Sequence, residues 1–129
     1  MIMTQIIARR EGALLIMVVH GDMVCSEAIS AVLEHYTDDT VKDVIWDFID
    51  GSNLKMTDRD FRALALAVKR TVDQGYRKGG RTVFVGNKVV EYGLLGMYGI
   101  IAETMGINIT YNAFKTLDEA KRWLAETSS

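Results

Sequence analysis

The chain has 129 residues, of which 49% are hydrophobic and 25% are charged, and it contains 11 glycines, one cysteine and no proline. These fractions are typical of one globular domain, and they exclude a disordered chain, a collagen-like fibre and a proline-rich ligand. Fifteen basic residues against 17 acidic ones give a formal net charge of -2 without any basic run, so no nucleic-acid partner is expected.

No targeting signal or membrane span is expected. The N-terminal sequence MIMTQIIARREG lacks the basic leader and apolar core of a secretory signal. The longest apolar stretch, residues 92–102, has about 11 residues, whereas a bilayer crossing needs ~20. Cys25 has no second cysteine to pair with, which fits a reducing compartment. We therefore expect a cytoplasmic protein that forms a single domain over residues 1–129.

The first half of the chain predicts a hairpin, a helix and a buried strand. Two β-rich runs, residues 4–9 and 13–19, are separated by three residues that end in Gly12, which is typical of a β-hairpin. Apolar residues spaced along one helical face from Ala28 to Tyr36 then predict a helix. Residues 41–49 (VKDVIWDFI) favour a mostly buried strand.

A long amphipathic helix is expected at residues 58–74. Thr57 and Asp60 resemble a capping box at its start, and Gly75 stands where a helix usually ends. The following loop, residues 75–81, contains three glycines and three basic residues. It could accept a phosphate, although a solvated connector is the simpler interpretation.

A short buried strand is predicted at residues 82–85, and two helices with one strand between them complete the fold. A helix at residues 89–105, which Asn87 could cap, precedes a strand at residues 107–111. A capping box at Thr116 and Glu119 then predicts a terminal helix. The order ββαβαβαβα predicts an α/β fold with a mixed, mostly parallel sheet flanked by helices.

The helix at residues 89–105 is apolar on too many sides for an ordinary surface helix. It also contains Gly93, Gly96 and Gly99, and each helical glycine costs ~0.5–1 kcal/mol relative to alanine. Three interpretations stay open: tight packing on the sheet, a protein or homodimer surface, and a cleft for a small apolar ligand. The candidate surface comprises Tyr92, Gly93, Leu95, Gly96, Met97, Tyr98 and Gly99.

Four carboxylates gather around the start of the helix at residues 58–74, namely Asp47, Asp50, Asp58 and Asp60. Carboxylates in such a place could hold Mg²⁺, but their spacing does not fit an EF-hand loop. Negative charge in a first helical turn is favoured by the helix dipole, which is the simpler explanation. No metal or cofactor is therefore expected.

Cys25, His20 and His35 are the residues that could serve as soft ligands or as a nucleophile with its base. Their scattered spacing makes no zinc pattern. Cys25 lies near a predicted helix N-terminus, which would lower its pKa, although a buried, inert cysteine is the simpler interpretation. We predict no catalytic residue and no enzymatic activity.

Four segments carry a resemblance to a known family: residues 44–48 (VIWDF), 56–64 (MTDRDFRAL), 92–98 (YGLLGMY) and 114–124 (FKTLDEAKRWL). Together they resemble the STAS domain family of sulphate transporters and anti-sigma-factor antagonists, and more narrowly its SpoIIAA-like branch of small bacterial proteins. The resemblance implies a SpoIIAA-like fold and a non-enzymatic regulatory module that binds a protein partner, such as a kinase or an anti-sigma factor. Combined with the apolar helix at residues 89–105, it favours a homodimer.

In the antagonist branch, a partner kinase phosphorylates a serine in an Asp-Ser-[Ser/Thr]-Gly motif at the N-terminus of the second helix. The equivalent stretch here is Thr57, Asp58, Arg59 and Asp60, so the motif is degenerate. A phosphate on Thr57 would be repelled by the two neighbouring carboxylates. The family also looks similar in outline to CRAL-TRIO lipid carriers, so the alternative function is a binder or carrier of a small apolar or lipid-like ligand.

Overall fold

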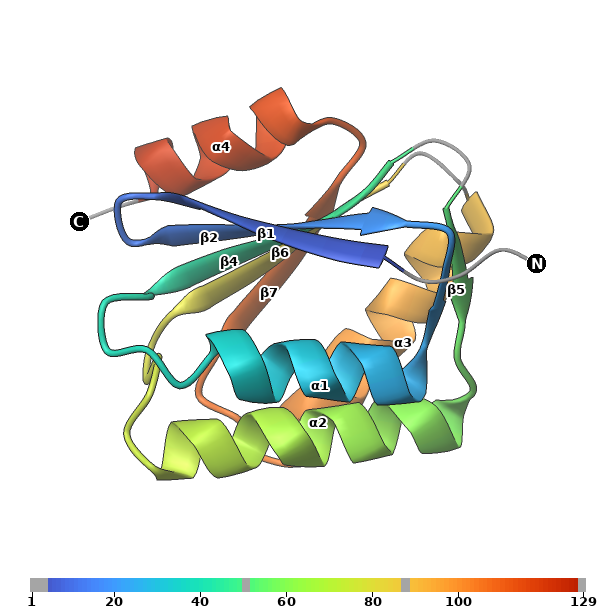
Figure 1. The fold of residues 1–129 in the computed structure, drawn as a ribbon, viewed down its shortest axis with the longest axis horizontal. Coiled ribbons are helices and arrows are strands. Elements are labelled where there is room, and N and C mark those ends of the chain that lie inside the picture. The colour runs from blue at the N-terminus through green and yellow to red at the C-terminus, as the bar shows by residue number, and fades with distance from the viewer. Residues whose placement is uncertain (1–4, 50–51, 87–88, 128–129) are drawn as a thin grey trace.

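A five-stranded sheet lies at the centre of the computed structural model, which describes residues 5–49, 52–86 and 89–127 (Figure 1). The strand order is β1-β2-β4-β6-β7, with bounds β1 (Gln5–Glu11), β2 (Leu14–His20), β4 (Asp43–Phe48), β6 (Arg81–Val85) and β7 (Thr110–Phe114). β1 pairs antiparallel with β2, and the other three pairings are parallel. The predicted α/β class with a mixed, mostly parallel sheet is therefore confirmed.

Two short strands add to the predicted element order. β3 (Asp22–Val24) and β5 (Asn53–Lys55) pair in parallel as a separate two-stranded sheet. Segments of three residues are too short to show a periodic pattern, which is why the sequence did not indicate them. β3 leads directly into α1 (Cys25–His35), and β5 ends three residues before α2 (Asp58–Asp73). The pairing thus places the beginnings of α1 and α2 close together.

The helices cover the two faces of the sheet unequally (Figure 1). α1, α2 and α3 (Val89–Thr104) lie on one face, and α4 (Leu117–Glu126) lies on the other. Successive side chains of a strand point to opposite faces, so Trp46 belongs to the larger core under three helices and Ile45 to the smaller core under α4. Among the described residues, no helix combines the length and apolarity that a bilayer crossing requires.

The predicted position of the last strand is wrong. β7 is formed by Thr110–Phe114 rather than by residues 107–111. Ile107 and Ile109 are 7% and 9% exposed and lie in the segment between α3 and β7, so they are apolar because they pack into the core. The predicted end of α2 is confirmed, because Gly75 follows the C-cap residue with a φ of +104°. The Asn87 cap falls outside the described residues.

Candidate functional site

The N-terminus of α2 is held by a reciprocal capping box, as predicted. Thr57 Oγ1 accepts a hydrogen bond from the backbone N–H of Asp60 at 3.3 Å, and Asp60 Oδ2 accepts one from the backbone N–H of Thr57 at 2.9 Å. The side chains of Thr57, Asp58 and Arg59 are exposed, and Asp60 is half-buried. The Thr57 hydroxyl therefore serves as a helix cap in the same turn as two carboxylates.

The described acidic residues around this helix do not converge on a metal site. No group of three or more His, Cys, Asp or Glu residues in the described part of the chain is arranged to hold a metal ion. Asp47 lies on β4 and faces the α4 side of the sheet, because it alternates with the inward-facing Trp46. Burial raises the pKa of the Asp47 carboxyl, and the positive charge of Arg9 partly opposes that shift. Asp50 lies outside the described residues.

Cys25 is the first residue of α1, and its side chain is half-buried beside the start of α2. Its Sγ donates to the carbonyl oxygen of Asp60 at a distance of 3.6 Å. Burial raises the pKa of the Cys25 thiol, and the negative charge of Asp60 raises it further. The expectation that the helix N-terminus lowers this pKa is therefore wrong, and the shift favours the protonated thiol over the thiolate.

The predicted surface on α3 divides between two sides of the helix. Leu95 and Tyr98 are 6% and 4% exposed, so they belong to the core and cannot form part of an exposed docking surface. The Tyr98 ring packs against Phe61 and Tyr111, with ring centroids 6.0 Å and 5.4 Å away. Burial raises the pKa of Tyr111 to about 12 and that of Tyr98 well above its usual range, so both rings stay uncharged.

The opposite side of α3 faces outward and is unusually open. Gly93 and Gly96 are exposed, and an added Cβ at either position would meet no atom within 4 Å. Met97 and Gly99 are half-buried, and the side chain of Tyr92 lies outside the described residues. Tight packing on the sheet therefore does not explain Gly93 and Gly96. Consecutive positions of a helix point around its whole circumference, which is why the predicted surface could not include all seven residues.

An apolar ridge with a groove on either side marks the outer face of α3. Ile100 is 67% exposed, the highest value among the exposed large hydrophobic side chains of the described residues. On one side lies the α2–α3 groove, with a volume of about 570 Å³; it is lined by Arg62, Leu66, Ile100, Ile101, Thr104 and Met105. On the other side lies the α3–β7 groove, of about 410 Å³, whose lining includes Gly96, Gly99, Glu103 and Ile109.

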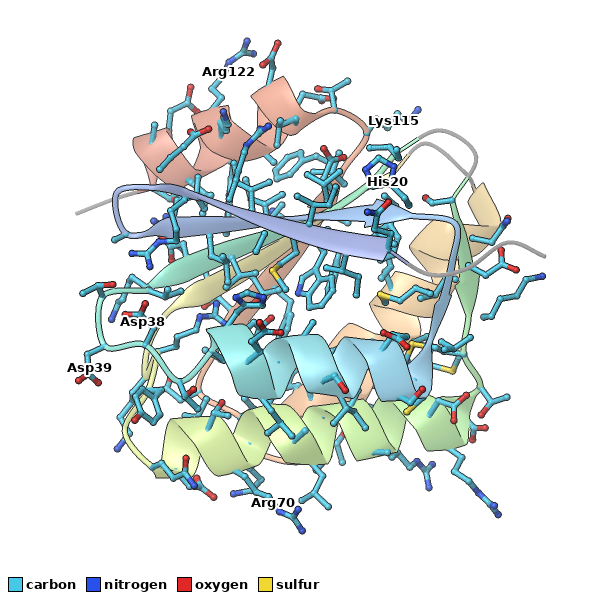
Figure 2. The ribbon with its side chains drawn as sticks, in the orientation of Figure 1. His20, Asp38, Asp39, Arg70, Lys115 and Arg122 are labelled. Atoms are coloured by element: carbon cyan, nitrogen blue, oxygen red, sulfur yellow. The ribbon has the colours of Figure 1, made fainter. Side chains whose placement is uncertain are left out.

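The outward-facing surfaces of α2 and α4 carry charged side chains. Arg70 on α2 and Arg122 on α4 point away from the sheet into solvent (Figure 2). Large exposed apolar patches on a protein surface commonly mark sites where another molecule binds. The outer face of α3 is therefore the strongest candidate for a binding surface in the described part of the chain.

An internal cavity lies between the three helices and the sheet, and it tests the interpretation of an apolar-ligand cleft. Its lining is mostly apolar and includes Met23, Leu54, Met56 and Leu95. The cavity volume is about 20 Å³, which accommodates roughly one water molecule, whereas small-molecule sites occupy ~300–1,000 Å³. In this conformation the core has no room for a lipid-like ligand.

Arg77 is a buried residue that the sequence placed in a solvated connector, and that expectation is wrong at this position. Its guanidinium stands 4.6 Å from the centre of the Tyr36 ring. Nε donates to the carbonyl oxygen of Lys42 at 3.1 Å, while Nη2 donates to the carbonyl of Arg81 at 2.8 Å and to Thr82 Oγ1 at 2.9 Å. Arg77 therefore ties the loop to the core and is poorly placed to bind a phosphate from solution.

No protein-family model matches this chain, and no curated protein sequence matches it at a significant level of similarity. The arrangement of the described residues is therefore what bears on function. It combines an exposed isoleucine, Ile100, two adjoining grooves and a capped helix N-terminus beside one of them. These features suit the binding of another polypeptide.

Proposed function

We propose that this protein is a non-enzymatic regulatory module that acts by binding another protein through the outer face of α3 and the adjoining N-terminal residues 57–60 of α2. The observation that carries the proposal is the exposed Ile100 ridge between two grooves. Arg62 lines the α2–α3 groove and lies shortly after the capping box, so the two parts of the surface adjoin.

The resemblance to the SpoIIAA-like branch of the STAS family supports the same class of function. It suggests a kinase or an anti-sigma factor as the regulatory partner. Because Asp58 or Arg59 stands where the antagonist branch has its phosphorylated serine, we propose that recognition here does not depend on phosphorylation. The Thr57 hydroxyl is instead assigned to helix capping.

The test compares binding of candidate kinases and anti-sigma factors from the same organism to matched variants, using isothermal titration calorimetry. Burying an isoleucine side chain contributes about 1.5–3 kcal/mol, so placing a charge at that position should weaken binding at least about tenfold. We expect this loss for Ile100→Glu. Leu33→Glu is the control, because Leu33 is 53% exposed on α1 rather than on α3. Equal affinities for the two variants would overturn the proposed surface.

A further inference from the structure

We propose that a second copy of this chain binds the outer face of α3, across a two-fold axis that runs along this helix. The inference rests on the proposed function, because it concerns the same surface, where a second copy and the regulatory partner would compete. A two-fold interface must be complementary to itself, since each copy contributes the same patch. The outer face of α3 meets this requirement in shape and in charge.

The shape argument concerns the ridge and its neighbouring groove. Ile100 projects from the surface, and the α3–β7 groove beside it contains Gly96 and Gly99, which have no side chains to fill it. An axis placed between ridge and groove brings Ile100 of each copy into the α3–β7 groove of the other. Each copy then buries its Ile100, the most exposed large hydrophobic side chain of the described residues.

The charge argument fixes the direction of the axis. Arg62 lies on the α2 flank of the ridge, in the groove that Ile100, Ile101, Thr104 and Met105 line from α3. Glu103 lies on the β7 flank of the same segment of α3. Neither side chain forms an ion pair with another described residue. The two flanks of this segment of α3 therefore carry opposite charges.

A two-fold axis parallel to α3 keeps the height of each residue and exchanges the flanks. Arg62 of one copy then faces the flank of the other copy that carries Glu103, and this pairing of flanks occurs twice. An axis perpendicular to α3 would place each flank against itself, with Arg62 facing Arg62. Like charges in contact disfavour association, so the parallel arrangement is the one this surface supports.

The distribution of apolar and charged residues on this face resembles a protein interface. Leu66 is 41% exposed, and Ile101 and Met105 are half-buried beside Ile100. Arg62 and Glu103 stand on the two flanks of this apolar centre. An apolar centre with a polar rim is the usual anatomy of protein–protein contacts.

The test is sedimentation equilibrium of the full chain over a wide range of concentrations, with charge-reversal variants. We expect the wild-type chain to dimerise and Arg62→Glu or Glu103→Arg alone to weaken dimerisation by roughly tenfold, because each creates two like-charge contacts. A mixture of the two variants restores both opposite-charge contacts and should associate like the wild type. Arg70→Glu is the control, because Arg70 is exposed on α2 outside the residues that line either groove.

Three results separate this inference from the proposed function. A chain that stays monomeric, but whose binding to the kinase or anti-sigma factor is weakened by Ile100→Glu, overturns the homodimer alone. A dimer that the charge reversals disrupt, with regulatory binding insensitive to Ile100→Glu, supports the homodimer and overturns the regulatory surface. If each single charge reversal leaves dimerisation unchanged but the mixture of the two variants dimerises more strongly than the wild type, the parallel axis is overturned.

Discussion

Replacing Gly80 by alanine tests how closely the loop before β6 approaches the backbone of Lys42, just before β4. A Cβ at this position would lie 2.3 Å from the carbonyl oxygen of Lys42 and 2.9 Å from that of Arg77. Both obstacles are backbone atoms, and hydrogen bonds hold them: the N–H of Gly80 donates to Arg77 O at 2.8 Å, and Arg77 Nε donates to Lys42 O at 3.1 Å. The clash cannot be relieved by a side-chain rotation.

The magnitude follows from these contacts. Overpacking a well-packed site costs about 1–3 kcal/mol, and a displaced hydrogen bond costs ~0.5–1.5 kcal/mol. We therefore expect Gly80→Ala to lower the free energy of unfolding by about 2–4 kcal/mol. Gly96→Ala should have the opposite sign, because Gly96 is exposed within α3 and a Cβ there would meet no atom within 4 Å. Alanine at an open helical site stabilises by about 0.5–1 kcal/mol.

Urea-induced unfolding, followed by circular dichroism, measures both changes. All variants are compared at the same low chain concentration, because self-association adds to apparent stability. An unchanged denaturant slope would show that the variants differ in stability rather than in the extent of unfolding. Gly80→Ala with wild-type stability, or Gly96→Ala that destabilises the chain, would refute the steric reasoning.

Three further predictions concern single polar groups. Thr57→Ala should lower the free energy of unfolding in urea by about 1 kcal/mol, because the cap needs a side-chain acceptor. Thr57→Asn should recover most of this loss, and equal losses in the two variants would contradict the capping role. Burial raises the pKa of Asp47, so its ionised form destabilises the fold at neutral pH and this cost disappears as pH falls through the folded-state pKa. Asp47→Asn should therefore melt at a higher temperature than wild type at neutral pH, with a difference that shrinks on acidification; a constant difference would count against it. Asp43→Asn should lower the free energy of unfolding in urea by about 1–3 kcal/mol, because it breaks the 2.7 Å ion pair with Arg81, whose side chain is 18% exposed. An unchanged free energy of unfolding would contradict a stabilising ion pair.

Features that depend on neighbouring residues in the chain could be predicted from the sequence. The caps at Thr57 and Thr116 accept hydrogen bonds from residues three positions ahead, so their pattern is visible in a short segment. The predicted helix at residues 58–74 agrees with α2 to within one residue, because its apolar stripe repeats over four turns. Strands alternating with such helices were sufficient to predict the α/β class.

Features that depend on distant residues were mispredicted or left open. The alternating spacing of Ile107 and Ile109 is typical of a strand, but these residues are apolar because they pack into the core after the end of α3. Arg77 belongs to a glycine-rich loop that looks solvated, yet its guanidinium is buried because Tyr36 and three oxygen acceptors surround it. None of these partners can be recognised from the loop sequence alone.

The candidate surface on α3 also depends partly on neighbouring residues in the chain and partly on distant ones. The sequence by itself determined that α3 is apolar on too many sides and contains three glycines, which indicated a candidate binding surface on this helix. Only the tertiary structure decided that Tyr98 faces the core while Ile100 faces solvent between two grooves. The physical reason is that helix periodicity is a local property, whereas the exposure of each face depends on which distant elements pack against it.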